Sequence, residues 1–235
     1  MTSETTPTPF DPNNDPAILA KIGAHVTQRL AANPAVQRVE CPDLQLYLYQ
    51  AFLSYADCKM LIDKIDAEAV PSTLYKGTEI AGFRTSSSCN LNRWDTDIAR
   101  LEKRMSDVLG IDNSYAETMQ GQRYYKGQEF KAHHDFFHPA QSYWEKEGVS
   151  GGQRSWTAMI FLNEPEQGGA TEFSHLGIGI RPATGMMLMW NNVNVDGTLN
   201  YKSLHTGTPV ISGEKHIITK WYRQNNWLEI NTPAS

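Results

Sequence analysis

The second half of this chain is a series of short strand-like runs separated by turn signals, and this pattern limits its fold more than any other feature. From residue 116 onward, runs rich in aromatic and β-branched residues recur every ten to fifteen residues. They occupy residues 117–125, 129–137, 154–163, 169–174, 178–182, 186–190, 202–207 and 215–222. Glycine pairs such as Gly151-Gly152 and Gly168-Gly169 lie between them. Strands in this number and spacing predict a β-sandwich or a jelly roll.

Helices are expected before these strands. Residues 15–30 place Pro16 at a first helical position, and Ser54 is suited to cap a second helix. Apolar residues then recur at helical spacing at Cys58, Leu61, Ile62, Ile65 and Ala69, and in a later helix, ended by Gly110, at Ile98, Leu101, Met105, Val108 and Leu109. Strands are also expected at residues 44–49 and near 83–87, the latter inside a loop-like segment at 72–92. Helices followed by many strands predict an α+β fold with the helices packed on one sheet.

The length of 235 residues suits one domain with a short N-terminal appendage. We expect residues 1–40 to contain a flexible tail, up to about residue 14, and the first helix. The domain itself is expected at residues 41–227, with helical support at 50–110 and the strand core at 115–227. Residues 228–235 are expected to form a second tail.

Composition argues against several classes of protein. A net charge of −5 lacks the basic excess of a general nucleic-acid binder, so no nucleic-acid partner is expected. No apolar run approaches the ~20 residues of a membrane span, so no membrane partner is expected. The three cysteines form no paired motif, and the first residues lack a secretory pattern, which favours a cytoplasmic protein. The sequence makes no prediction of the oligomeric state.

A histidine and an aspartate two residues apart, His133 and Asp135, lie in one strand-like run. Side chains alternate across a strand, so these two point to one face and His134 to the other. We take His205, seventy residues beyond Asp135, as the candidate for a third metal ligand. Two imidazoles and a carboxylate form a facial triad that suits iron(II) and oxygen chemistry. Such a triad leaves three positions open, two for a bidentate 2-keto acid and one for dioxygen.

Other interpretations of the histidines stay open at this point. A lone His-x-Asp pair occurs by chance in many proteins. His134 and His138 are four residues apart and on a helix could bind zinc, although the flanking aromatic residues, Gly127 and Pro139 oppose a helix there. The remaining histidines are interpreted as ordinary surface or structural residues: His25, His175 and His216.

Lys215 follows His205 by ten residues, just past the Ser212-Gly213 turn. On a regular strand it shares one face with Ile217, Thr219 and Trp221, so its ammonium points inward. A buried cation needs an anionic partner, which the distal carboxylate of 2-oxoglutarate would supply. A solvated lysine in a turn is the alternative.

Taken as a set, the motifs have a recognisable order and spacing. They are Tyr124-x-x-Gly127-x-x-Phe130-x-x-His133-x-Asp135, Arg154-x-x-Thr157, Gly168-Gly169-x-Thr171, and His205 followed by Lys215 and Trp221. Together they resemble the catalytic domain of prolyl 4-hydroxylases. The resemblance begins near Leu44, includes FRTSSSCNL at residues 83–91 and ends at Trp221, about three quarters of the chain.

The resemblance implies an iron(II)- and 2-oxoglutarate-dependent dioxygenase with a double-stranded β-helix core, a jelly-roll variant, and N-terminal helices on its major sheet. Such an enzyme uses O2 and 2-oxoglutarate, releases succinate, depends on L-ascorbate and hydroxylates prolyl residues of a peptide or protein. By resemblance, the iron ligands are His133, Asp135 and His205, and the co-substrate residues are Lys215, Tyr124, Thr171 and Trp221. Arg154 and Glu117 fall where relatives contact a peptide, and Arg84 lies near the end of a mobile loop at 72–92.

Two departures from the family pattern bear on the substrate. Arg223 stands where relatives carry a histidine near the substrate, and Phe161 replaces a common tyrosine. The segment 136–152 has its own composition, with Tyr143 and Trp144 expected on the rim of the active site. A hydroxylase of a small molecule or of a non-prolyl residue, on the same scaffold, is therefore the alternative function.

Overall fold

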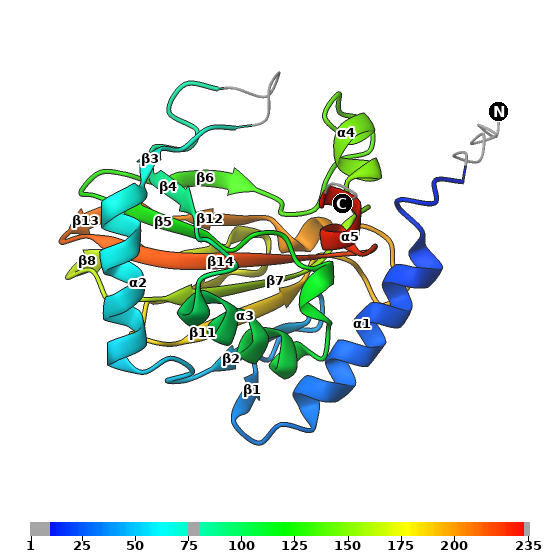
Figure 1. The fold of residues 1–235 in the computed structure, drawn as a ribbon, viewed down its shortest axis with the longest axis horizontal. Coiled ribbons are helices and arrows are strands. Elements are labelled where there is room, and N and C mark those ends of the chain that lie inside the picture. The colour runs from blue at the N-terminus through cyan, green and yellow to red at the C-terminus, as the bar shows by residue number, and fades with distance from the viewer. Residues whose placement is uncertain (1–9, 75–79, 233–235) are drawn as a thin grey trace.

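Two antiparallel sheets and three longer helices make up the fold in a computed structural model, which describes residues 10–74 and 80–232 (Figure 1). The larger sheet has eight strands in the order β1-β2-β11-β7-β14-β5-β4-β3. Their bounds are Val36–Arg38, Leu46–Tyr49, Met187–Asn191, Arg154–Phe161, Lys215–Arg223, Gln120–Tyr124, Ser87–Asn90 and Val70–Pro71, in that order. Every pairing within it is antiparallel.

A smaller sheet of four strands lies against the larger one, in the order β10-β9-β12-β6. These strands are Ile178–Ile180, Thr171–Phe173, His205–Gly207 and Phe130–His133. A further pair joins β13 to β8, which are Val210–Ser212 and Gln167–Gly168. The expected α+β fold with a jelly-roll core is confirmed.

Three helices cover the outer face of the larger sheet: α1 (Pro16–Ala31), α2 (Tyr55–Glu68) and α3 (Thr96–Leu109) (Figure 1). The expected cap of α2 is present, because the Ser54 hydroxyl accepts from the Asp57 amide and the Asp57 carboxylate accepts from the Ser54 amide. Gly110 ends α3 with a φ of 73°, a backbone conformation that favours glycine. Two short helices, α4 (Trp144–Val149) and α5 (Trp227–Asn231), lie near the C-terminal end of β14 (Figure 1).

Alternation along the central strands divides the interior into two cores. On β7, Ala158 and Ile160 pack toward the helices, whereas Met159 and Phe161 pack toward the smaller sheet. Each such large apolar side chain contributes roughly 1.5–3 kcal/mol when it is fully buried. The core between the two sheets also holds Trp190 and Phe173, and it is the layer in which the polar residues described below are buried.

A buried ion pair joins α3 to β14 on the helix side of the larger sheet. The Lys220 ammonium lies 2.8 Å from the Glu102 carboxylate, and both side chains have no exposed surface. Arg93 and Asn113 contact the other carboxylate oxygen of Glu102 at 3.5 and 2.9 Å. Burial lowers the pKa of Lys220 to about 8 despite the neighbouring carboxylate.

The expected separation of residues 1–40 from the domain is wrong. Val26 and Leu30 of α1 belong to the core beneath the larger sheet, and β1 is an edge strand of that sheet. The N-terminal tail also ends earlier than expected, because Trp144 donates to Asp11 and the Gln153 amide donates to the Asn13 carbonyl. Residues 1–9 lie outside the described part of the chain.

Two other boundaries differ from expectation, and two short strands were not expected. The strand expected near 83–87 begins at Ser87, and before it only Arg84 makes an isolated bridge, to Phe130. Residues 228–231, expected in a tail, belong to α5, and Asn231 donates to the Ser150 carbonyl. The unexpected strands are β8 and β13. In the described residues, no helix combines the length and apolar character needed to cross a membrane.

Candidate metal and co-substrate site

The three predicted metal ligands, His133, Asp135 and His205, converge on one point. One ligand atom from each lies within 4.8 Å of the others. The Asp135 Oδ1 atom is 3.7 Å from Nε2 of His133 and 3.9 Å from Nε2 of His205. These separations are less than twice a metal–ligand bond of about 2.1 Å, so one ion can reach both atoms of each pair.

Strand pairing brings the two histidines together. His133 is the last residue of β6 and His205 the first of β12, and the two are directly paired in the smaller sheet. Asp135 lies beyond the end of β6, in a bend rather than on the strand. His133 and Asp135 therefore approach each other because the chain bends after β6, and not through the expected alternation along one strand.

Both histidines are held in a form that can bind a metal. Nδ1 of His133 is 2.8 Å from the Lys131 carbonyl oxygen, and Nδ1 of His205 is 3.0 Å from that of Ser203. A carbonyl oxygen only accepts, so each Nδ1 carries the hydrogen and each Nε2 presents its lone pair. This is the orientation that partners of metal-binding histidines usually impose.

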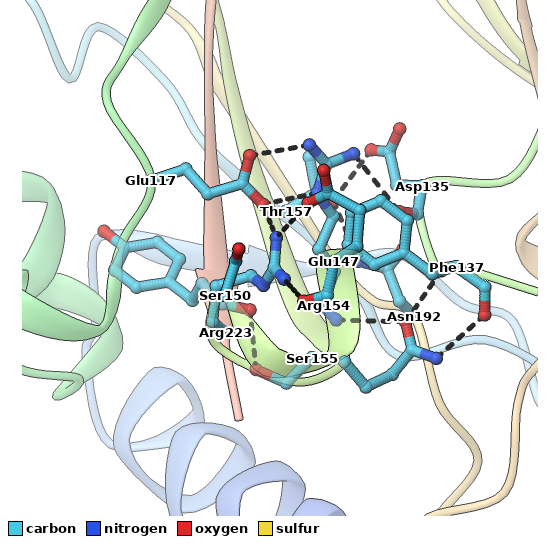
Figure 2. Close-up of polar contacts among 12 residues, drawn as sticks. Glu117, Asp135, Phe137, Glu147, Ser150, Arg154, Ser155, Thr157, Asn192 and Arg223 are labelled. Carbon is cyan, nitrogen blue, oxygen red and sulfur yellow. Dashed lines mark hydrogen bonds and ion pairs between the residues drawn. The ribbon is translucent and has the colours of Figure 1, made fainter. Parts of the chain in front are cut away.

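The carboxylate of Asp135 is oriented by a chain of two further side chains. The Thr157 hydroxyl donates to Asp135 Oδ2 at 2.8 Å, and the Asn192 amide donates to Thr157 at 2.9 Å (Figure 2). Oδ1 is left for a metal. All three residues are buried, so this geometry is fixed by the core.

The electrostatics of the triad also favour a cation. Burial raises the pKa of the Asp135 carboxyl, but the neighbouring His205, His133 and Arg154 bring it below its ordinary value, so it is ionised. Burial, together with His205, lowers the pKa of His133 to about 3, so its imidazole is neutral. One carboxylate and two imidazoles form the donor set of a non-haem iron(II) site, and these residues fit that ion.

The helical zinc alternative is wrong, because neither His134 nor His138 lies in a helix. His25 and His216 have structural roles, as expected. His25 contacts the Gly110 carbonyl, and the fully buried His216 pairs with Asp66 at 2.9 Å.

Lys215 is a buried cation, as predicted, and not a solvated turn residue. Its side chain is 2 % exposed, and its ammonium lies 5.4 and 5.5 Å from the ring centroids of Tyr124 and Phe161. Among the described residues, no hydrogen bond or ion pair to this ammonium is found. Burial accordingly lowers its pKa to about 7. An unpaired ammonium in such surroundings is suited to an anionic ligand.

The other predicted co-substrate residues lie in the same interior layer. Tyr124 pairs with Lys215 across β5 and β14, and Thr171 is 1 % exposed on β9. The Tyr124 hydroxyl donates to Gln122 at 2.6 Å, and the Gln122 amide donates to Thr219 at 3.1 Å. The hydrogen of Tyr124 must therefore turn away from Gln122 before it can serve a ligand.

A cavity of about 680 Å³ opens beside the triad. It is lined by His133 and Asp135, by several aromatic rings, including those of Phe130, Phe137, Tyr143 and Trp221, and by polar residues including Arg84, Glu117 and Arg154. Four residues predicted to contact substrate, Arg84, Glu117, Tyr143 and Arg154, thus lie in its wall. A cavity of this size accommodates a small ligand or a short stretch of peptide.

Glu117 and Arg154 form a bidentate pair in this wall. Nε and Nη2 of Arg154 each donate to a carboxylate oxygen of Glu117 at 2.6 Å (Figure 2). The guanidinium also stacks on Trp221 at 4.1 Å and on Phe137 at 4.6 Å from the ring centroids. Burial raises the pKa of the Glu117 carboxyl, but Arg154 and Arg223 lower it below its ordinary value.

Two predicted substrate residues do not line the cavity. Arg223 is 1 % exposed and lies behind the wall, where it donates to Glu117 at 2.8 Å. Trp144 packs beside Phe137 and donates to Asp11. The expectation that Arg223 and Trp144 contact the substrate directly is therefore wrong, because both lie behind the residues that line the cavity.

Sequence reasoning missed the supporting residues Gln122, Asn192 and Phe137. They come from three separate segments, and no local spacing connects them to the triad. Thr157 was part of a motif but had no assigned role. No local signal marked them; β5, which contains Gln122, has the mostly polar sequence QGQRY.

Comparison with known proteins extends these findings. The family model described as the 2OG-Fe(II) oxygenase superfamily matches residues 119–223. Probable prolyl 4-hydroxylase 3 of Arabidopsis thaliana is 31% identical over 199 residues, covering 74% of this chain and 68% of that protein. Probable prolyl 4-hydroxylase 10 of the same plant is 31% identical over 205 residues, covering 77% and 69%.

Solved structures agree with these relatives. The viral collagen prolyl hydroxylase from Paramecium Bursaria Chlorella virus-1, in its 2OG complex, matches with a TM-score of 0.60 and 27% identity, covering 76% of this chain and 95% of that one. A prolyl-4-hydroxylase of Pseudomonas putida matches with a TM-score of 0.54 over 86% of this chain and 98% of that one. At 16% identity, the second likeness shows a shared fold alone.

Proposed function

This chain belongs to the prolyl 4-hydroxylase family of 2-oxoglutarate- and iron(II)-dependent oxygenases, and we propose that it hydroxylates prolyl residues of a peptide or protein. The observation that carries the proposal is the buried ammonium of Lys215, without a partner among the described residues, in the layer that also holds the histidine–aspartate–histidine triad. A metal triad alone is compatible with many reactions. A buried cation that can pair with the distal carboxylate of a dicarboxylic keto acid favours a reaction that uses 2-oxoglutarate.

The residues of the chain would divide the work as follows. His133, Asp135 and His205 hold iron(II), while Lys215 pairs with the distal carboxylate of 2-oxoglutarate. Tyr124, paired with Lys215 across β5 and β14, and Thr171, buried on β9, would assist Lys215 with their hydroxyls, and Trp221 lines the cavity. When bound, iron and 2-oxoglutarate supply the oxidation: O2 delivers one oxygen to a substrate C–H bond and one to succinate, with release of CO2.

The protein itself contributes orientation and exclusion of water. Thr157 and the two backbone carbonyls fix the ligand atoms, and the aromatic wall keeps the reacting centre dry. Arg84, Arg154, Glu117 and Tyr143 line the space in which a peptide would lie. Dependence on L-ascorbate and a cytoplasmic location are parts of the same proposal.

The test is incubation of the purified protein with iron(II), 2-oxoglutarate, ascorbate and a panel of proline-containing peptides. Mass spectrometry should find one added oxygen on proline, together with peptide-stimulated release of succinate. The Asp135→Ala variant should lose nearly all of both signals. Succinate release by active enzyme, with no oxygen added to any peptide in a broad panel, would reject proline as the target.

A second candidate is hydroxylation of a small molecule or of a non-prolyl residue on the same scaffold. It is favoured by the environment of Glu117, whose two oxygens already accept three charged hydrogen bonds from Arg154 and Arg223. Arg223 stands at the position where the family pattern has a histidine, so the charged groups around Glu117 depart from that pattern. A metabolite or non-proline peptide that stimulates succinate release, where prolyl peptides do not, would establish this function instead.

A further inference from the structure

All three guanidinium nitrogens of Arg223 are already bonded to groups of the protein. Its Nε atom donates to the Gly152 carbonyl at 2.9 Å, and Nη1 lies 2.8 Å from Glu117 and 3.3 Å from Glu147. Nη2 donates to the Glu147 carbonyl. Figure 2 shows the contacts of this guanidinium with Glu117 and Glu147, and Glu147 belongs to α4.

Two of the partners of Arg223 are cavity-lining residues, although Arg223 itself is not. Glu117 lines the cavity and is shared between Arg223 and Arg154. The ring of Phe137 also lines the cavity, and its centroid lies 4.7 Å from the Arg223 guanidinium and 4.6 Å from that of Arg154. A change at Arg223 therefore reaches the cavity through a carboxylate and an aromatic ring.

The same guanidinium also contacts residues 147–152, the segment that leads from α4 to the start of β7. Glu147 belongs to α4, and Gly152 immediately precedes Gln153, which exchanges two hydrogen bonds with the backbone of Phe137. Charge is balanced within the cluster, because two arginines face two glutamates. Neither arginine is left as an uncompensated buried charge, which would be costly.

We propose that Arg223 is a positioning residue for substrate binding, which holds the Glu117–Arg154 pair and Phe137 in place and couples them to α4 through Glu147. The proposal rests on the proposed function, because it takes Glu117 and Arg154 to be the contacts of the substrate. Arg223 touches neither the metal ligands nor the cavity, so co-substrate binding should not depend on it.

Kinetics of Arg223→Gln test the positioning role. The KM for the prolyl peptide should rise about tenfold, the size expected when a charge-assisted hydrogen bond that orders a binding group is lost. The KM for 2-oxoglutarate and the peptide-independent turnover of 2-oxoglutarate should stay within about twofold of wild type. Arg223→Lys should lie between, because one ammonium can reach Glu117 but cannot also serve Gly152 and Glu147.

Hydrogen exchange supplies a readout that does not depend on activity. The backbone amides of residues 144–149 should exchange faster in Arg223→Gln, which removes the bonds to both the Glu147 carboxylate and the Glu147 backbone carbonyl. Glu147→Gln removes only the charge of the carboxylate and keeps the carbonyl bond, so its exchange should rise by less. Lys146→Gln is the matched control, since Lys146 is exposed on the same helix, and its exchange and peptide KM should equal those of wild type. If Arg223→Gln fails to fold, the peptide KM and the hydrogen exchange of Glu147→Gln and Arg223→Lys provide the test instead.

An unchanged peptide KM in these variants overturns the proposal. So does an equal rise in both KM values with lowered thermal stability and unaltered exchange in α4, because that pattern describes a merely structural arginine. Failure of the proposed function is distinguishable: wild-type enzyme would then hydroxylate no peptide, while the exchange measurements would still show whether Arg223 couples α4 to the cavity wall.

Discussion

At the scale of single residues, a substitution of Lys215 should affect binding of 2-oxoglutarate without affecting binding of the metal. Replacing Lys215 by Ala would leave the distal carboxylate of 2-oxoglutarate buried without a partner. We expect the apparent KM for 2-oxoglutarate to rise at least about 100-fold, the order expected when one member of a buried ion pair is removed. Initial-rate kinetics measure this change, and metal titration should show iron(II) affinity within about twofold of wild type.

The control for this substitution is Lys202→Ala, because Lys202 is an exposed lysine three residues before the ligand His205. Its KM for 2-oxoglutarate should equal that of wild type. Equal dependence on 2-oxoglutarate in wild type and Lys215→Ala would contradict the role proposed for Lys215.

The titration of Lys215 predicts a pH dependence with a definite sign. Its pKa is lowered to about 7 in the free protein, and a bound carboxylate stabilises the ammonium form. Affinity for 2-oxoglutarate is therefore full below pH ~7 and falls above it, by up to about tenfold per pH unit. The measurement is the KM for 2-oxoglutarate between about pH 6 and about pH 9, the range that spans this pKa.

Lys215→Arg is the control for this pH profile, because a guanidinium keeps its charge across the range. Its KM should stay flat, whatever its absolute value. A wild-type profile as flat as that of the arginine variant would show that Lys215 does not titrate in this window.

The candidate ligands could be selected from the sequence, and the residues that support them could not. His133, Asp135, His205 and Lys215 stood out because chemistry restricts metal ligands and buried cations to few residue types, and the structure brings the first three together and buries the fourth. Arg223 and Trp144 were misplaced. An arginine or tryptophan in a sequence gives no sign of whether it faces a cavity or the back of its wall, since that depends on partners such as Glu117 and Asp11.

At the scale of elements, the ion pair between Glu102 and Lys220 links α3 to the central strand β14. Glu102→Ala would leave Lys220 and Arg93 buried without their carboxylate. We expect a loss of about 3 kcal/mol in the free energy of unfolding, measured from urea transitions. The triad lies on the opposite side of the sheet, so KM for 2-oxoglutarate in the remaining folded protein should be unchanged.

The double variant Glu102→Leu with Lys220→Met tests the cause of this loss. It removes the charges of Glu102 and Lys220 and keeps side-chain volume, so it should recover the part of the lost stability that comes from an unpaired Lys220, while Arg93 stays without its carboxylate. A single variant as stable as wild type would mean that the pair makes no net contribution. A double variant no better than the single one would mean that an unpaired Lys220 is not the cause of the loss.

Local signals explain which elements could be predicted. The Ser54 cap and the Gly110 stop act within one turn of their helices, so the sequence alone contains them. The short strands β8 and β13 depend on pairing between residues more than forty positions apart, as in Val210 with Gly168. The docking of residues 11–15 likewise depends on Gln153 and Gln224, which no nearby pattern announces.

At the scale of the whole molecule, the metal site joins parts of the chain that are far apart. His133 and Asp135 flank the end of β6, and His205 begins β12, about seventy residues later. Their coming together needs both the smaller sheet and the larger sheet behind it, from which Thr157 reaches Asp135. The site therefore exists in the folded state and not in the unfolded chain. Metal binding should thus increase the free energy of unfolding.

Metal loading should accordingly raise the melting temperature. A ligand that binds only the folded state at 100 times its dissociation constant adds about 2.7 kcal/mol, and in a chain of this length each kcal/mol shifts the midpoint by about 2–4 °C. We expect a rise of about 5–10 °C when manganese(II), a redox-inert probe for carboxylate and imidazole ligands, is added with 2-oxoglutarate. Calorimetry measures this rise.

Asp135→Ala should abolish the rise, whereas Asp43→Ala, which removes an exposed carboxylate outside the cavity, should leave it intact. Because stabilisation follows from occupancy and not from turnover, an identical rise in wild type and Asp135→Ala would place the metal elsewhere on the protein.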